Sequence, residues 1–128
     1  MFINLTPHAI RIIDVDRVVH EIGPSGTVAR VETVEKEEVP VVVDGAKFSV
    51  KSRTMGAVSG LPEPNGSSLF LVSSMVLDAI QGRHDVFAPD TGKTAVRDER
   101  GLVWAVVNLI ECRVEVDPDP EFEFEGDA

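Results

Sequence analysis

Tyrosine is absent from this chain, cysteine occurs once, and six Phe and one Trp are the only aromatic residues. The single cysteine, Cys112, excludes an internal disulfide, so we expect it to pack as a small apolar residue. No stretch approaches the roughly 20 apolar residues that span a bilayer, and the N-terminus lacks the pattern of a secretory signal. We therefore expect a soluble protein of the cytoplasm.

Basic residues are also scarce, since 12 Lys and Arg stand against 22 Asp and Glu, giving a formal net charge of -10. Such a charge repels phosphate backbones and anionic lipids at long range. We predict no general nucleic-acid binding and no membrane association. Part of the acidic excess lies in residues 32–38 and 117–127, which leaves room for a local basic pocket elsewhere.

The length and composition are those of one globular domain. A chain of 128 residues builds one hydrophobic core, and 43% hydrophobic with 27% charged residues is the usual globular mixture. Val and Ile outnumber Leu, which favours strands over helices. We predict a mainly β domain over residues 1–116, α+β at most, built as a compact antiparallel sandwich or barrel-like fold with one short helix at about 74–81.

Turn residues divide the chain into short strands. Asp44-Gly45 between Val39–Val43 and Ala46–Val50 predicts a hairpin, because both turn positions need positive φ angles. Residues 56–66, rich in Gly and Pro, and the polar residues 83–94 are predicted loops. Further strands are expected at 2–5, 10–15, 18–22, 27–34 with a bulge, 68–72, 95–97 and 102–110.

The acidic tail, residues 117–128, allows two interpretations. Two prolines and repelling charges favour a flexible segment. Phe122 and Phe124 alternate with glutamates, which is also the pattern of an edge strand added to a neighbouring subunit.

Polar residues gather around the predicted helix and the segment that follows it. They are Ser73, Ser74, Arg83, Asp85, Arg97 and Asp98. Two guanidinium forks can bind a phosphate or a carboxylate, while the aspartates hold the forks or accept hydrogen bonds from a sugar. The alternative is that these groups form loop salt bridges and turn caps, which stabilise little at a surface.

Asn4, Thr6 and His8 form a second polar group within one strand end and turn. They are candidates to contact the base or sugar of a ligand, or they cap the turn with their own side chains. The histidines occur in unrelated contexts, without the partners of a catalytic triad or the spacing of zinc ligands. We therefore predict no catalytic residue, no metal and no cofactor, and favour a binding protein over an enzyme.

Several short motifs together resemble a family of small accessory proteins of tailed bacteriophages and prophages. The similarity rests on Asn4-Leu5-Thr6-Pro7-His8-Ala9-Ile10, Pro24-Ser25-Gly26-Thr27-Val28-Ala29-Arg30-Val31, Leu61-Pro62-Glu63-Pro64 with Gly66, Val72-Ser73-Ser74, Arg83 with Asp85, and Arg97-Asp98 with Gly101. The tail from Asp117 onward departs from the shorter family pattern.

The resemblance implies a phage protein of the host cytoplasm, and three functions remain open. The first is an anti-defence sponge, a homo-oligomer that sequesters a small phosphorylated or nucleotide-like ligand, by analogy with compact phage proteins of this kind. The second is a virion component such as a capsid decoration or connector protein. The third is an acidic inhibitor of a host protein.

Overall fold

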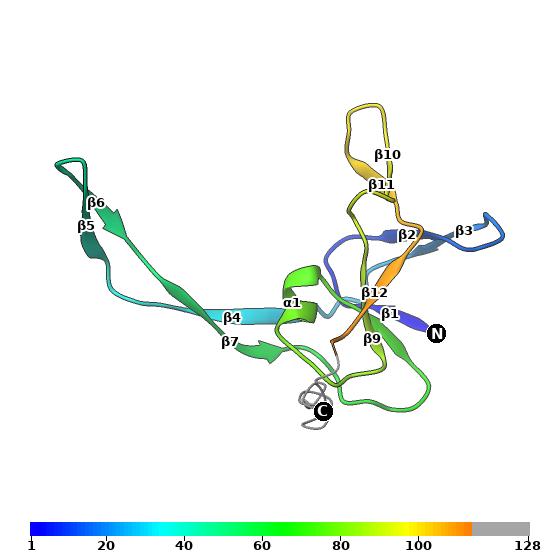
Figure 1. The fold of residues 1–128 in the computed structure, drawn as a ribbon. Helices are drawn as coiled ribbons and strands as arrows, with labels where there is room; N and C mark the ends of the chain where they lie inside the picture. Colours follow the sequence, from blue (N-terminus) through cyan, green and yellow to red (C-terminus); the bar gives the residue numbers. More distant parts are fainter. Residues whose placement is uncertain (114–128) are drawn as a thin grey trace, which may run out of the picture.

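The computed structural model describes residues 1–113 (Figure 1). Its centre is a four-stranded sheet in the order β1-β8-β9-β12. The strands are β1 (Phe2–Asn4), β8 (Leu69–Leu71), β9 (Val86–Pro89) and β12 (Leu109–Glu111). β8 runs parallel to both β1 and β9, and β12 is antiparallel to β9. This sheet and the helix beside it are called the body.

The core of the body lies on the central strands β8 and β9. Phe70 and Leu71 are consecutive in sequence and both are buried, so both faces of β8 are covered. Phe70 joins a cluster with side chains from β9, from the helix and from four segments that lie between or after the strands. The members of this cluster are Leu5, Ala29, Phe70, Val72, Val76, Leu77, Val86, Ala88 and Cys112.

The helix α1 (Ser74–Asp78) begins where the sequence predicts it but ends earlier. Ser73 is the N-cap, and its side-chain oxygen accepts a hydrogen bond from the backbone N–H of Val76 at 3.3 Å. The predicted end at residue 81 is wrong, because Ala79 already caps the helix and the chain turns at Gly82 with φ 80°. Two buried residues hold this short helix on the body, since such a helix is unstable alone.

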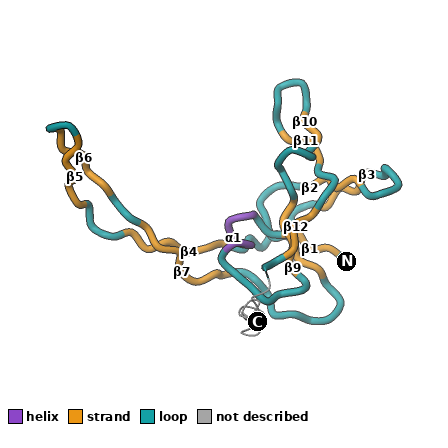
Figure 2. Tube along the Cα trace, viewed as in Figure 1, coloured by secondary structure: helices purple, strands orange, loops and turns teal. Residues whose placement is uncertain are grey.

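Three hairpins project from the body (Figure 2). Two are short: β2 (Ile10–Ile13) with β3 (Val19–Ile22), and β10 (Val96–Arg97) with β11 (Val103–Ala105). The third is long, because β4 (Arg30–Glu35) pairs with β7 (Arg53–Ser59) and the chain between them forms a further hairpin, β5 (Val39–Val43) with β6 (Ala46–Val50). Residues 30–59 are called the arm.

The mainly β fold with one short helix is confirmed, as is the hairpin turn, where Asp44 and Gly45 have φ angles of 51° and 82°. A bulge is present in β4 between Val31 and Thr33, as the sequence predicts. The sheets of residues 1–113 form no closed barrel, and the central sheet is mixed rather than antiparallel. The arm also departs from the compact shape that we expected.

Three segment predictions are wrong. The loop predicted at 56–66 begins only after Ser59, because β7 pairs with β4 across Gly56. The loop predicted at 83–94 contains β9, which lies between two strands in the sheet. The strand predicted at 102–110 is divided into β11 and β12, because the Val106 carbonyl accepts a hydrogen bond from Ile13 N while the Asn108 carbonyl accepts one from Asp90 N.

The predicted acidic tail, with its possible edge strand at Phe122 and Phe124, lies outside the described residues. Within residues 1–113, no helix has the length and apolar character needed to cross a membrane.

Candidate functional site

Hydrogen bonds hold the guanidinium group of Arg83 against neighbouring residues of the body. Its Nε donates to Asp85 Oδ1 at 2.8 Å, and its Nη2 donates to Asp85 Oδ2 at 3.0 Å and to the Pro62 carbonyl at 2.9 Å. Both charged side chains are only 18% exposed. The hydrogen bond from Arg83 lowers the pKa of Asp85 and the same bond raises the pKa of Arg83. This pair joins the loop before β8 to the segment that leads into β9.

Arg97 and Asp98 hold the β10–β11 hairpin. Arg97 donates to the carbonyl groups of Gly101 at 3.0 Å and Thr91 at 3.1 Å. The Asp98 carboxylate accepts from the backbone N–H groups of Arg100 and Leu102, which is a turn cap. The structure therefore shows the predicted salt bridge for Arg83 with Asp85 and the predicted turn cap for Asp98, whereas Arg97 bonds backbone carbonyl groups and forms no ion pair with Asp98.

The structure does not bring Arg83 and Arg97 together. Arg83 precedes β9 and Arg97 follows it, and the two segments lie at opposite ends of that strand (Figure 1). Ser73 and Ser74 lie at a third place, the start of α1. The expected cleft between the two guanidinium groups is absent from the part of the chain that the structure describes.

Asn4 organises the second predicted group. Asn4 is buried, with 1% of its surface exposed. Its side-chain Nδ2 donates to the carbonyl groups of His8 at 2.8 Å and Ile22 at 3.0 Å. Its Oδ1 accepts from Thr6 N at 2.9 Å and Thr6 Oγ1 at 2.7 Å. These bonds tie the end of β1 to the following turn and to β3. The capping interpretation accounts for Asn4 and Thr6, and the exposed His8 takes part through its carbonyl.

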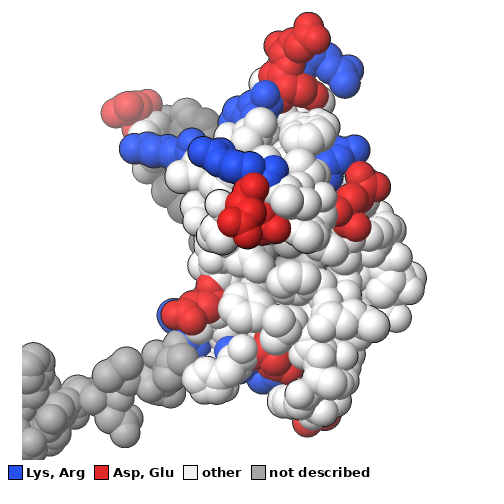
Figure 3. All heavy atoms as spheres, turned by 90° about the vertical axis from the view of Figure 1, so that its right-hand side faces the viewer, with Lys and Arg blue, Asp and Glu red and all other residues white. Residues whose placement is uncertain are grey.

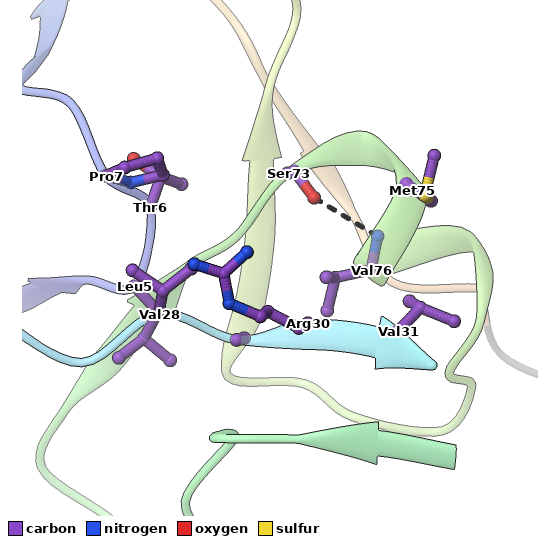
Figure 4. A pocket seen from close by; sticks show the side chains of 10 residues that line it. Leu5, Thr6, Pro7, Val28, Arg30, Val31, Ser73, Met75 and Val76 are labelled. Carbon is purple, nitrogen blue, oxygen red and sulfur yellow. Dashed lines mark hydrogen bonds between the residues drawn. The ribbon is translucent and has the colours of Figure 1, made fainter. Parts of the chain in front are cut away.

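A cleft at the base of the arm brings together residues from the two predicted polar groups and from β4 (Figure 4). Its volume is about 270 Å³. Thr6 and Ser73 line it, and Arg30 of β4 reaches into it. Among residues 1–113 the Arg30 side chain has no hydrogen bond or ion pair. Leu5, Val28, Val31 and Val76 supply apolar lining, together with Met75.

Sequence reasoning missed Arg30 as a site residue. The signal was present, because Arg30 lies between Ala29, which is buried, and Val31, which is partly buried. An arginine between two core residues is held by its backbone at a fixed place on the surface. What the sequence did not reveal is that α1 and the turn after β1 lie on either side of it.

A second hollow of about 340 Å³ lies beside Arg83. Backbone and small polar side chains form much of its wall, including Gly66, Ser67, Ser68 and Gly82. The Arg83 donors facing Asp85 and Pro62 are already used. A phosphate bound here would compete with the carboxylate of Asp85.

The outer part of the arm carries an apolar face. Directly opposite residues of β5 and β6 pair as Val39 with Val50, Val41 with Phe48 and Val43 with Ala46. Because opposite residues of an antiparallel pair share a face and alternate along the strand, these six residues lie on one side of the hairpin. They are called the apolar face. Pro40, Val42, Lys47 and Ser49 lie on the other side.

Nothing within residues 1–113 covers the apolar face. Every residue from 32 to 57 is exposed. Val39 is 57% exposed and Phe48 is 51% exposed. A contiguous exposed apolar patch is a candidate interaction surface.

Searches against protein-family models, curated proteins and solved structures found no match to this chain. The resemblance to phage accessory proteins therefore stays a prediction, and the functional argument depends on the geometry. On the side of the molecule seen in Figure 3, basic side chains lie together across the upper part with acidic side chains around them, and most of the face is uncharged.

Proposed function

We propose that this protein is a non-enzymatic structural subunit that assembles with further copies of itself through the arm. The single observation that carries the proposal is the exposed apolar face, whose six residues alternate strictly with the residues of the opposite side. This function corresponds to the virion component among the three functions that the sequence left open.

The physical argument begins with the stability of the hairpin. An isolated two-stranded hairpin is marginally stable in water, because it lacks a second layer to bury its apolar side chains. Within residues 1–113, the β5–β6 hairpin pairs only with itself and has no buried residue. A partner that covers Val41 and Phe48 removes apolar area from water and stabilises the hairpin, which favours assembly.

The chemistry of the two sides of the hairpin supports a specific orientation. The apolar face holds four Val, one Ala and one Phe, whereas the other side carries the polar Lys47 and Ser49 together with Pro40 and Val42. The polar side chains of the two strands therefore all lie on one side, and a hairpin that only extended into solvent would gain nothing from this arrangement. An amphipathic two-stranded ribbon is suited to pack one side on a partner and leave the other in water.

A matched pair of substitutions tests the proposal. Val41 and Val42 are neighbours in β5, both exposed, and they point to opposite sides of the hairpin. In sedimentation equilibrium, we expect the wild type to form a defined oligomer, Val41→Asp to weaken it by about 100-fold in dissociation constant, and Val42→Asp to leave it within about three-fold. A wild-type protein that stays monomeric at millimolar concentration would contradict the proposal.

The phage setting needs its own experiment, because it depends on the resemblance alone. A virion component is present in purified particles in stoichiometric amount. Mass spectrometry measures the amount of the protein in purified particles and in infected-cell lysate. Detection only in the lysate would remove the virion role, while self-association in the Val41 and Val42 experiment would still stand.

The sponge hypothesis stays a prediction, with the hollow beside Arg83 as the place to test it. Calorimetry of the wild type and Arg83→Ala with cyclic and ADP-ribose-type nucleotides measures binding directly. Heat that disappears in the variant would support the small-ligand function, and the absence of heat for every nucleotide would leave it unsupported.

A further inference from the structure

We propose that the tip of the arm of one copy docks into the cleft at the base of the arm of a second copy, where Asp44 pairs with Arg30. The contact is reciprocal, so two copies exchange arms around a twofold axis. This inference rests on the proposed assembly function and names the acceptor surface.

The position of the two surfaces within the arm favours the exchange. Arg30 is the first residue of β4, at the end of the arm next to the body, and Asp44 lies in the turn at the far end (Figure 1). When two identical arms lie antiparallel around a twofold axis, each tip meets the base of the other. One symmetric arrangement therefore makes both contacts at once.

The charges at the two ends are complementary and unused. The Arg30 side chain and the Asp44 side chain each have no hydrogen bond or ion pair within residues 1–113. By contrast, the middle of the arm already has internal pairs, Lys51 with Glu35 at 3.3 Å and Arg53 with Glu35 at 3.5 Å. Arg30 and Asp44 therefore have charges that a partner can pair with, as do Glu32, Lys36, Glu37 and Lys47, which also have no ion pair within residues 1–113.

The apolar groups also match. The lining of the cleft includes Met75 of α1, which is 57% exposed, with Val31 on the same side and Val28 on the other side (Figure 4). Val43, next to Asp44, belongs to the apolar face of the tip. At about 270 Å³, the cleft has room for one or two aliphatic side chains and is smaller than most small-molecule sites, which begin at about 300 Å³.

The size of the contact favours two reciprocal dockings over one. A five-residue two-stranded hairpin covers roughly 17 Å by 10 Å, or about 170 Å² in projection. A stable protein interface buries about 800 Å² on each partner. One docked tip is too small for this. Two tips cover about 340 Å² in projection, so the rest of the required area has to come from the two arms lying side by side.

A charge-exchange experiment tests the pairing. We expect Arg30→Asp and Asp44→Arg each to raise the dimer dissociation constant by about ten-fold or more, because each change replaces two attractive contacts per dimer with two repulsive ones. The double variant, Arg30→Asp with Asp44→Arg, restores the wild-type dimer. Arg100→Asp, at the exposed turn of β10–β11, is the matched control and leaves dimerisation unchanged.

Cross-linking provides a second measurement that does not depend on affinity. In an oxidised mixture of Arg30→Cys and Asp44→Cys chains, we expect a disulfide-linked dimer between the two variants. A mixture of Arg30→Cys and Arg100→Cys serves as the control and yields no such product. Cys112 is buried in the core and does not compete in the folded protein.

The outcomes separate this inference from the assembly function. If Val41→Asp dissociates the wild-type oligomer while the charge variants behave like the control, the Arg30 cleft is not the acceptor and the assembly function survives. A monomeric wild type overturns both. Restored dimerisation in the double variant, together with the Arg30–Asp44 cross-link, supports both.

Discussion

The body and the arm each place a phenylalanine in a short strand, with opposite results. Phe70 lies in the wholly apolar strand β8 and is 1% exposed, whereas Phe48 lies between Lys47 and Ser49 in β6 and is 51% exposed. β8 has a strand on both sides and α1 nearby, while β6 pairs with β5 alone among residues 1–113. The local pattern of residues predicts a strand in both regions, and the elements packed around the strand decide whether it is buried.

The two regions also differ in what fixes their geometry. In the body, side-chain hydrogen bonds of Asn4 and Arg83 join segments distant in sequence. In the arm, local turn chemistry and strand pairing determine the register. Substitutions in the body are therefore expected to change stability, and substitutions in the arm to change association.

The largest expected effect comes from comparing the two phenylalanines. Phe70→Ala leaves a cavity in the core and should lower the free energy of unfolding by about 3–5 kcal/mol. Phe48→Ala removes only the cross-strand contact with Val41 within a copy, about 0.2–1 kcal/mol. Chemical denaturation at a concentration where the protein is monomeric measures both. Equal losses for the two variants would contradict the distinction between body and arm.

A smaller effect is expected for Asn4→Ala. The substitution leaves the Ile22 and His8 carbonyl groups and the Thr6 N–H without their buried partner, and should cost about 1–3 kcal/mol of stability. Asn65→Ala is the control, because Asn65 makes its bonds in an exposed loop. A stability loss in the control as large as that of Asn4→Ala would show that burial is not the cause.

The Arg83–Asp85 pair should give the body a pH dependence. Because the pKa of Asp85 is lowered in the folded protein, its contribution to stability is present above the ordinary value of 3.8 and is lost as the pH falls below it. Thermal unfolding of the wild type and of Asp85→Asn, from about pH 6 to about pH 2, measures this contribution to stability. We expect the stability difference between the two proteins to shrink as the pH falls, and a constant difference would contradict the pair's role.

The smallest effect on the body is expected for Gly45→Ala at the tip of the arm. Gly45 has φ 82° and open space around its Cα, so the variant is strained in its backbone without a steric clash. The cost is about 1 kcal/mol, confined to the β5–β6 hairpin. Amide hydrogen exchange should show faster exchange in β5 and β6 and unchanged exchange in β8 and β9. Faster exchange in the body would show that the two regions unfold together.

The sequence by itself determined those features of this protein that depend on the chemistry of neighbouring residues. The Val-rich composition predicted a mainly β fold, Asp44-Gly45 placed the hairpin turn, and the helix predicted from about residue 74 begins at Ser74. Each of these depends on backbone preferences of a few neighbouring residues, which is why they could be predicted.

Tertiary structure alone decided the rest. β9 lies in a polar segment and became a central strand because β8 and β12 supply its hydrogen-bond partners. Arg83 and Arg97 were separated by β9, while Arg30 was brought beside Thr6 and Ser73. The physical reason is that strand partners and cleft walls come from residues far apart in the chain, and a local pattern contains no information on which of them will meet.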